Sequence, residues 1–173
     1  CGAKLREPTP PPEVPSSTPP RELRRGAIFA KRYEIIEELG RGGMGRLYRV
    51  LDTKINQEVA LKILRPEISR DQQTIGRFSN ELRLARQVAH KNVCRMYHLG
   101  EDNGTHFIIM EYIPGQDLQS MIKMTKQLSM ETAIDIAKQI CEGLNEAHRL
   151  GVIHRDLKPG NIMIDREGNA RIL

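Results

Sequence analysis

The stretch HRDLKPGN, residues 154–161, is the most informative part of this chain. Its proline and glycine disfavour a helix, so a loop is expected there. The loop carries a carboxylate at Asp156, an ammonium at Lys158 and an amide at Asn161. A carboxylate can orient a hydroxyl, a cation can neutralise a phosphate, and an amide oxygen can bind Mg²⁺. Each residue alone also suits an ordinary loop role, but the joint spacing predicts a site for phosphoryl transfer.

Composition indicates one globular domain. The chain has 173 residues, 39% hydrophobic and 28% charged, which is enough for a real core. The net charge of +5 is uneven, because residues 1–32 hold seven Lys/Arg against three Asp/Glu. The remainder is nearly neutral, which argues against a nucleic-acid partner. No apolar run approaches the roughly 20 residues of a membrane span. A cytoplasmic location is expected, although a longer parent protein can be membrane-anchored.

The three cysteines give no disulfide framework, because their number is odd and none are closely spaced. Cys94 and Cys141 lie in apolar contexts and are expected in the core. Residues 1–7 resemble a remnant of a zinc-ribbon knuckle, but Cys1 is one ligand of the four that zinc needs. A lipid-modified Cys1 is a weaker alternative.

Residues 8–32 are predicted to form a basic, proline-rich linker. Seven of the thirteen residues from Pro8 to Pro20 are proline, which favours an extended spacer. Their PxxP-like spacing also suits a ligand for a protein partner, but a plain spacer is favoured.

A regular pattern of apolar residues begins at Tyr33. Alternating or buried runs predict strands at 33–39, 46–51, 58–64, 95–99, 105–111, 162–164 and 170–173. Helical spacing predicts helices at 71–89, 116–123 and 129–150, the last with Ser129 as its N-cap. Five strands around one helix, followed by helices, predict an α+β fold with two lobes.

The stretch GRGGMG at residues 40–45 fits the pattern G-x-G-x-x-G. A dinucleotide fold places this motif between a strand and a helix, whereas strand-like segments flank it here. Glycines also serve plain hairpins, but a loop without side chains can lie close over phosphates. Leu39 and Leu47 flank the loop and can cover a bound base. They can also belong to the sheet core, and the two roles are compatible.

Lys62 interrupts the apolar run 59–64. A buried lysine is costly unless it is paired, and the alternative is a side chain that extends to solvent. On the next helix, Glu81 lies beside Phe78 at the edge of the apolar stripe. A Lys62–Glu81 ion pair is therefore expected, with the ammonium placed to contact the phosphates of ATP.

Together these residues resemble the protein-kinase family, specifically bacterial serine/threonine kinases of the eukaryotic-like type. The resemblance runs from about residue 32 to 173. It includes the glycine loop, VALK at 59–62, Glu81, the hinge-like MEYIPG at 110–115, and the loop at 154–161. It implies a complete small lobe at about 33–110, with a five-stranded antiparallel sheet and one helix. A hinge at 111–115 and the first part of a helical large lobe at 116–173 would follow.

The resemblance also implies roles for single residues. Asp156 would be the catalytic base, Lys158 would contact the γ-phosphate, and Asn161 would ligate Mg²⁺. Lys62 and Glu81 would form the ion pair. Ala60 and Met163 would sandwich the adenine, Met110 would be the gatekeeper, and Glu111 and Ile113 would offer backbone groups. The residues implied to bind ATP are Leu39, Gly40, Arg41, Gly42, Gly43, Met44, Gly45, Arg46, Leu47, Ala60, Lys62, Met110, Glu111, Ile113 and Met163.

The family's Asp-Phe-Gly motif is expected immediately after Leu173, with the second magnesium ligand. The chain is therefore expected to be an internal fragment, nearly inactive alone, with an exposed apolar patch on the helix at 129–150. The parent is expected to transfer the γ-phosphate of Mg-ATP to serine or threonine hydroxyls of proteins. Arg155 resembles the subgroup controlled by activation-loop phosphorylation. The alternatives are a pseudokinase or scaffold module and, less favoured, a small-molecule phosphotransferase.

Overall fold

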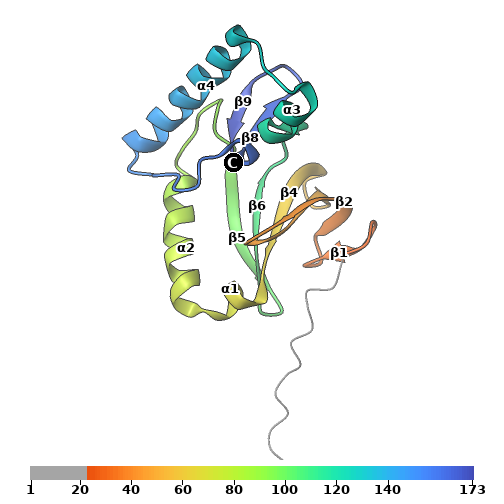
Figure 1. Ribbon diagram of the computed structural model, residues 1–173. Coiled ribbons are helices and arrows are strands. Elements are labelled where there is room, and N and C mark those ends of the chain that lie inside the picture. The colour runs from red at the N-terminus through yellow and green to blue at the C-terminus, as the bar shows by residue number, and fades with distance from the viewer. Residues whose placement is uncertain (1–22) are drawn as a thin grey trace, which may run out of the picture.

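The computed structural model describes residues 23–173, except for the side chains of Arg70, Gln72 and Arg77 (Figure 1). The predicted zinc-ribbon remnant at 1–7 and the proline-rich part of the linker lie outside the described residues.

The small lobe is built on an antiparallel sheet, as predicted, with the strand order β1-β2-β3-β4-β6-β5. The sheet has six strands, whereas five were expected. The strands are β1 (Ile28–Phe29), β2 (Tyr33–Gly42), β3 (Gly45–Asp52), β4 (Gln57–Leu64), β5 (Met96–Asp102) and β6 (Thr105–Glu111). The additional strand β1 pairs with the start of β2.

Residues 23–32 fold onto the sheet, so the linker prediction is wrong for this part of the chain. Phe29 meets Phe107 edge-on, with ring centroids 5.1 Å apart. Leu23 and Ala27 also pack against the sheet core. Arg32, counted as a linker charge, donates to both carboxylate oxygens of the buried Asp52, at 2.8 and 2.7 Å. The apolar residues and this paired charge hold the segment in place.

The two faces of the sheet bury different sets of side chains, because neighbouring residues on a strand point to opposite sides. On β4, Val59, Leu61 and Ile63 enter one core cluster. Ala60 and Leu64 enter the other, which the helix α2 (Gln72–Ala85) covers with Leu82. Lys62 has the same parity as Ala60, so it projects from the face that carries α2.

A short helix, α1 (Pro66–Arg70), precedes α2 and was not predicted. Pro66 begins it, because a proline at the first helical position loses no hydrogen bond. The backbone amide of Gln73 donates to the Asp71 side chain, which caps α2. α2 ends at Ala85, four residues before the predicted end. After Ala85 the backbone forms hydrogen bonds between residues three apart, such as Val88 N–H to Ala85 O, instead of the four-residue spacing of an α-helix.

The large-lobe part combines helices with a small antiparallel sheet of order β7-β8-β9. Its elements are β7 (Gly115–Asp117), α3 (Leu118–Thr125), α4 (Met130–Arg149), a 3₁₀ turn (Pro159–Asn161), β8 (Ile162–Asp165) and β9 (Ala170–Ile172). Ser129 caps α4 as predicted, accepting from the Thr132 amide at 3.1 Å. At Gly143, α4 lies so close to β9 that an added Cβ would be 2.9 Å from Ile172 Cδ1.

Strand β7 replaces the first residues of the predicted helix at 116–123. An added Cβ at Gly115 would lie 2.1 Å from the Ile164 carbonyl oxygen, so a glycine is needed for this strand pairing. The prediction for Cys94 is confirmed, whereas Cys141 is exposed on α4 and its prediction is wrong. Met130 and Ile134, also on α4, are 80% and 48% exposed. Among the residues described, no helix combines the length and apolar character that a membrane crossing requires.

Candidate active site

Three polar residues of the loop at 154–161, Asp156, Lys158 and Asn161, meet in one hydrogen-bonded set. Lys158 Nζ lies 3.0 and 2.7 Å from the two carboxylate oxygens of Asp156. The Asn161 amide donates to Asp156 Oδ2 at 2.9 Å and to its carbonyl oxygen at 2.8 Å. The 3₁₀ turn at Pro159–Asn161 brings the amide back to the aspartate. The local chain alone is therefore sufficient to assemble this set.

These contacts keep Asp156 ionised. The hydrogen bond from Lys158, followed by that from Asn161, lowers the pKa of the Asp156 carboxyl below its ordinary value. The side chain is 55% exposed, so a substrate hydroxyl can approach it. Asp156 thus has the charge and the access that a proton acceptor needs.

Asn161 also has the features of a cation ligand. Its NH₂ group makes both of the hydrogen bonds to Asp156, and no bond within residues 23–173 uses its Oδ1. A free amide oxygen beside a carboxylate matches the ligands that Mg²⁺ prefers. A dedicated cage is absent, since no group of three or more His, Cys, Asp or Glu among the described residues is placed to hold a metal. The oxygen donor of Asn161 fits Mg²⁺, which is commonly held by one or two side chains together with the phosphates of a ligand.

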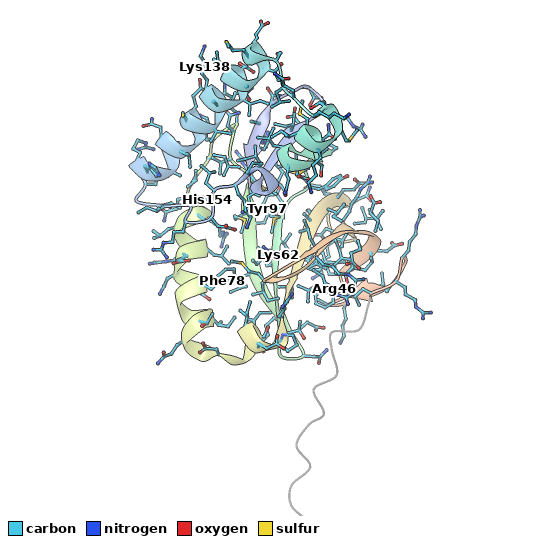
Figure 2. The ribbon with its side chains drawn as sticks, in the orientation of Figure 1. Arg46, Lys62, Phe78, Tyr97, Lys138 and His154 are labelled. Atoms are coloured by element: carbon cyan, nitrogen blue, oxygen red, sulfur yellow. The ribbon has the colours of Figure 1, made fainter. Side chains whose placement is uncertain are left out.

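In the small lobe, Lys62 lies in a partly desolvated position on β4 (Figure 2). Burial lowers the pKa of its ammonium, the charge of Asp156 acts against that shift, and Lys158 adds to it. The pKa of Lys62 therefore responds to two charges of the loop at 154–161. Its ammonium lies 4.0 Å from the sulfur of Met44 in the glycine loop.

The predicted ion pair between Lys62 and Glu81 is not formed. Glu81 instead pairs with Arg155, the residue before Asp156. The side chains of this pair are 56% and 69% exposed. Helical spacing placed Glu81 at the edge of the apolar stripe, and in the structure its carboxylate contacts the loop at 154–161 instead of the lysine of the sheet. Arg155 reaches it from a backbone with φ of +63°, outside the usual region for a side chain of this size.

Most residues expected around the adenine come together in one apolar cluster. Ala60, Met110 and Ile113 are buried at 5%, 8% and 7% exposure. Leu47 and Met163 pack against them from β3 and β8. The cluster thus joins apolar side chains of both lobes next to the expected hinge.

Leu39, which was also expected to cover the base, is 41% exposed and stands outside the cluster.

The glycine loop is the hairpin between β2 and β3, as predicted. Added Cβ atoms at Gly40, Gly42 and Gly43 would meet nothing within 4 Å, so open space surrounds this stretch. Gly45 differs, because its φ is +156° and a Cβ there would lie 1.9 Å from the Ile63 carbonyl oxygen. The guanidinium groups of Arg41 and Arg46, expected at the nucleotide, both pair with Glu38.

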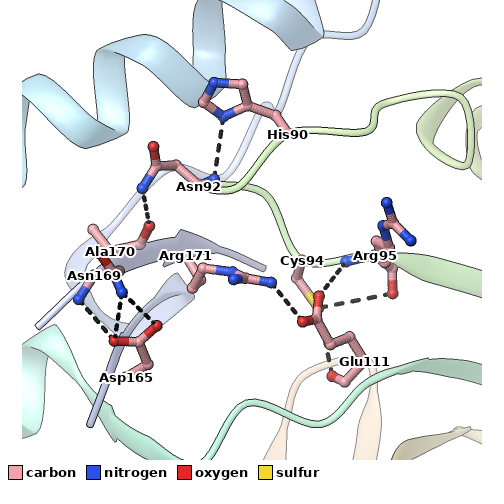
Figure 3. Close-up of polar contacts among 9 residues, drawn as sticks. All are labelled: His90, Asn92, Cys94, Arg95, Glu111, Asp165, Asn169, Ala170 and Arg171. Atoms are coloured by element: carbon pink, nitrogen blue, oxygen red, sulfur yellow. Dashed lines mark hydrogen bonds and ion pairs between the residues drawn. The ribbon is translucent and has the colours of Figure 1, made fainter. Parts of the chain in front are cut away.

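The expected hinge residue Glu111 has partners that sequence reasoning missed (Figure 3). Its carboxylate pairs with Arg171 of β9 and accepts from the backbone amide of Arg95 at 3.2 Å. The Cys94 thiol lies 3.6 Å from the Glu111 carbonyl oxygen. Burial raises the pKa of this thiol to about 12, so it stays protonated. No local spacing signals these contacts, because the partners are far apart in sequence.

The segment 90–94, which the sequence placed within the small lobe, is bonded to the large-lobe sheet (Figure 3). The Cys94 amide donates to the Ile172 carbonyl at 2.7 Å, and the Ile172 amide donates to the Asn92 carbonyl at 2.9 Å. The Asn92 side-chain amide reaches the Ala170 carbonyl at 2.7 Å. The lobes are therefore joined both through the hinge and through this segment.

Comparison with known proteins gives consistent matches. The model of the protein kinase domain matches residues 33–173. A probable serine/threonine-protein kinase of Clostridium acetobutylicum is 38% identical over 139 residues, or 80% of this chain and 21% of that protein. The serine/threonine-protein kinase PrkC of Bacillus subtilis is 37% identical over 147 residues, or 85% and 23%. This chain thus spans less than a quarter of the length of these two relatives.

Solved structures agree with this match. The kinase domain of PknI from Mycobacterium tuberculosis superposes with a TM-score of 0.75 at 26% identity, over 87% of this chain and 62% of that one. The small-lobe sheet, the helices and the loop at 154–161 accordingly have the protein-kinase arrangement, and the chain belongs to the protein kinase family.

Proposed function

We propose that residues 33–173 are the nucleotide-binding lobe and catalytic loop of a serine/threonine protein kinase. Such an enzyme transfers the γ-phosphate of Mg-ATP to serine or threonine hydroxyls of proteins. One observation carries the proposal: Asp156, Lys158 and Asn161 form one bonded set. The influence of the Asp156 and Lys158 charges on the pKa of Lys62 is consistent with it. The names of the relatives support the choice of serine and threonine.

The proposed roles follow from the chemistry of each side chain. Bound Mg-ATP supplies the phosphoryl group. Asp156, ionised and exposed, accepts the proton of the attacking hydroxyl. Lys158 neutralises charge that develops on the transferred phosphoryl group, and Asn161 offers its Oδ1 to the metal. Lys62 holds the phosphates from the opposite lobe.

The apolar cluster of Ala60, Met110 and Met163 offers a site for the adenine. The hinge is expected to bind the polar edge of the base through backbone groups of Glu111 and Ile113. Although the Cys94 thiol contacts the Glu111 carbonyl, an oxygen with two lone pairs can accept a second bond. Leu39 and the open glycines 40, 42 and 43 are proposed to cover the nucleotide.

The alternative of a scaffold module draws on one observation, the pairing of Glu81 with Arg155 instead of Lys62. Activity separates the two functions. In the intact protein, transfer of labelled phosphate to a protein substrate that disappears in Asp156→Asn supports catalysis. Mg-ATP binding without any transfer supports the scaffold. Residues 1–173 alone are proposed to transfer little phosphate, since they cover 62% of a solved kinase-domain chain.

A further inference from the structure

Met44 combines access to solvent with contact to a residue of the proposed active site. Its side chain is 48% exposed, and its sulfur lies 4.0 Å from the Lys62 ammonium. It occupies the turn of the glycine loop, immediately before Gly45.

Two bonds from one arginine fix the backbone of this turn. The Arg65 amide donates to the Met44 carbonyl at 3.0 Å, and the Arg65 guanidinium donates to the Gly42 carbonyl at 3.0 Å. Gly45 lies tightly against the Ile63 carbonyl, where no side chain fits. The turn is therefore held to the end of β4, and the thioether is directed at the ammonium on the same strand.

Lys62 has no strong acceptor within residues 23–173. The carboxylate expected to pair with it, Glu81, is engaged by Arg155. A thioether sulfur is a weak acceptor and leaves most of the hydrogen-bonding capacity of an ammonium unused. A stronger acceptor at the position of the sulfur would capture this ammonium.

We propose that Met44 is a site of reversible oxidation by hydrogen peroxide, and that its sulfoxide competes with the phosphates of ATP for Lys62. The proposal rests on the proposed function, because it assigns Lys62 to the phosphates. A sulfur lone pair attacks one oxygen of the peroxide, a sulfur–oxygen bond forms and the oxygen–oxygen bond breaks. The second oxygen leaves as hydroxide, the sulfur-bound oxygen releases its proton, and the hydroxide takes up that proton to become water. Sulfur loses two electrons and the peroxide gains them.

The sulfoxide differs from the thioether in its strength as a hydrogen-bond acceptor. The sulfoxide oxygen is a strong, polar acceptor, and the pinned turn holds it beside the Lys62 ammonium. A hydrogen bond to a charged group is stronger than one between neutral groups. The Lys62 ammonium would therefore stay hydrogen-bonded to the Met44 sulfoxide within the same chain. The phosphates of a nucleotide would have to displace the sulfoxide oxygen from it.

The experiment uses the intact protein, treated with graded amounts of hydrogen peroxide, with oxidation at each methionine read by mass spectrometry. Mg-ATP affinity is measured by calorimetry. We expect affinity to fall about tenfold as Met44 sulfoxide accumulates. Methionine sulfoxide reductase should restore it. The variant Met44→Leu, of similar volume and not oxidisable in this way, is compared with its own untreated affinity, and that value should not change with peroxide.

Two further measurements make the result specific. Met130, which is 80% exposed on α4, will also be oxidised, so Met130→Leu should lose affinity as the unchanged protein does. The rate at which an amine-reactive reagent acylates Lys62 reports the new hydrogen bond in the absence of nucleotide. This acylation rate should fall on oxidation of the unchanged protein but not of Met44→Leu.

The outcomes separate this proposal from the proposed function. An untreated protein that fails to bind Mg-ATP contradicts the proposed function, while the acylation rates still test the Met44–Lys62 contact. An unoxidised Met44, or equal acylation rates in Met44→Leu and the unchanged protein after peroxide, would overturn the inference.

Discussion

The two lobes differ in how completely their polar groups at the candidate site are assembled. On the large-lobe side, Asp156, Lys158 and Asn161 are already bonded to one another. On the small-lobe side, Lys62 and Glu81 are apart, each with another neighbour. The first set belongs to one short loop, whereas the second depends on where α2 lies relative to the sheet. Local chain geometry thus fixes the catalytic loop, and tertiary placement decides the lysine–glutamate pair.

The ion pair that holds Glu81 in place also contributes little free energy. Its observed pair with Arg155 is exposed, and exposed ion pairs contribute about 0.2–1 kcal/mol. A difference of this size is readily offset by a ligand that favours another arrangement. Phosphates bound at Lys62 are such a ligand, so the small-lobe side is expected to rearrange on nucleotide binding while the loop side stays as it is.

The largest effect is expected on the assembled side. Asp156→Asn removes the proton acceptor, and phosphate transfer by the intact protein should fall by about 10²- to 10⁴-fold. Transfer of label from γ-labelled ATP to a protein substrate measures it. Asp135→Asn on α4, an exposed aspartate bonded to Gln139, is the matched control and should change little. Equal rates for Asp156→Asn and the unchanged protein would contradict the proposed role.

Removing the cation from the other side should have the next largest effect. In Lys62→Ala the phosphates lose their small-lobe contact, so Mg-ATP affinity should drop by about tenfold or more, since hydrogen bonds to charged groups contribute about 1.5–3 kcal/mol. Titration of the nucleotide by calorimetry gives the result. Lys138→Ala, on the exposed part of α4 (Figure 2), serves as the control. If both variants bind alike, Lys62 does not hold the phosphates.

A smaller, opposite change is expected when Glu81 is released. Arg155→Gln removes the observed partner, so Glu81 becomes available to Lys62 and Mg-ATP affinity should rise by about 1.4- to 5-fold. Arg149→Gln removes another arginine–glutamate pair, with the partly exposed Glu146, and should leave affinity unchanged. A lower affinity in Arg155→Gln would show that the observed pair supports nucleotide binding.

The smallest effect concerns pH. Lys158 and Asn161 stabilise the charged form of Asp156, so its pKa lies below the ordinary value of 3.8. The acidic limb of the pH–rate profile that reports this group should therefore lie below that pH. In Lys158→Ala the largest stabilising contact is gone, and the pKa should move upward. Carboxyl NMR titration of the two proteins tests the direction, and a downward move would contradict the assignment.

Sequence patterns predicted the elements that have a strong, regular signal. The apolar run of β4 and the N-cap of α4 were found because burial and capping leave local signatures. β1 was missed, since two residues within a basic stretch carry no periodicity. β7 was mistaken for the start of a helix, because its pairing depends on the close approach of Gly115 to β8.

The residues of the candidate site also fall into those that sequence patterns predicted and those that they missed. The loop residues were predicted from their spacing, and the structure joins them. The contact between Glu81 and Arg155 was not predicted, because helical periodicity gives the face of a side chain but not the element opposite it. Arg171 was missed for a related reason. Its partner Glu111 lies on another lobe, and charge pairing across lobes has no period in sequence.

The bonds between segment 90–94 and β9 have a mechanical consequence. Two bodies attached at neighbouring but separate places turn most easily about the line through those attachments. Sliding and twisting would stretch the Cys94–Ile172 and Asn92–Ile172 bonds, whereas opening and closing would leave them nearly unstrained. The relative motion of the lobes should therefore be close to a single rotation, which changes both the gap between Lys62 and Asp156 and the contact between Glu81 and Arg155.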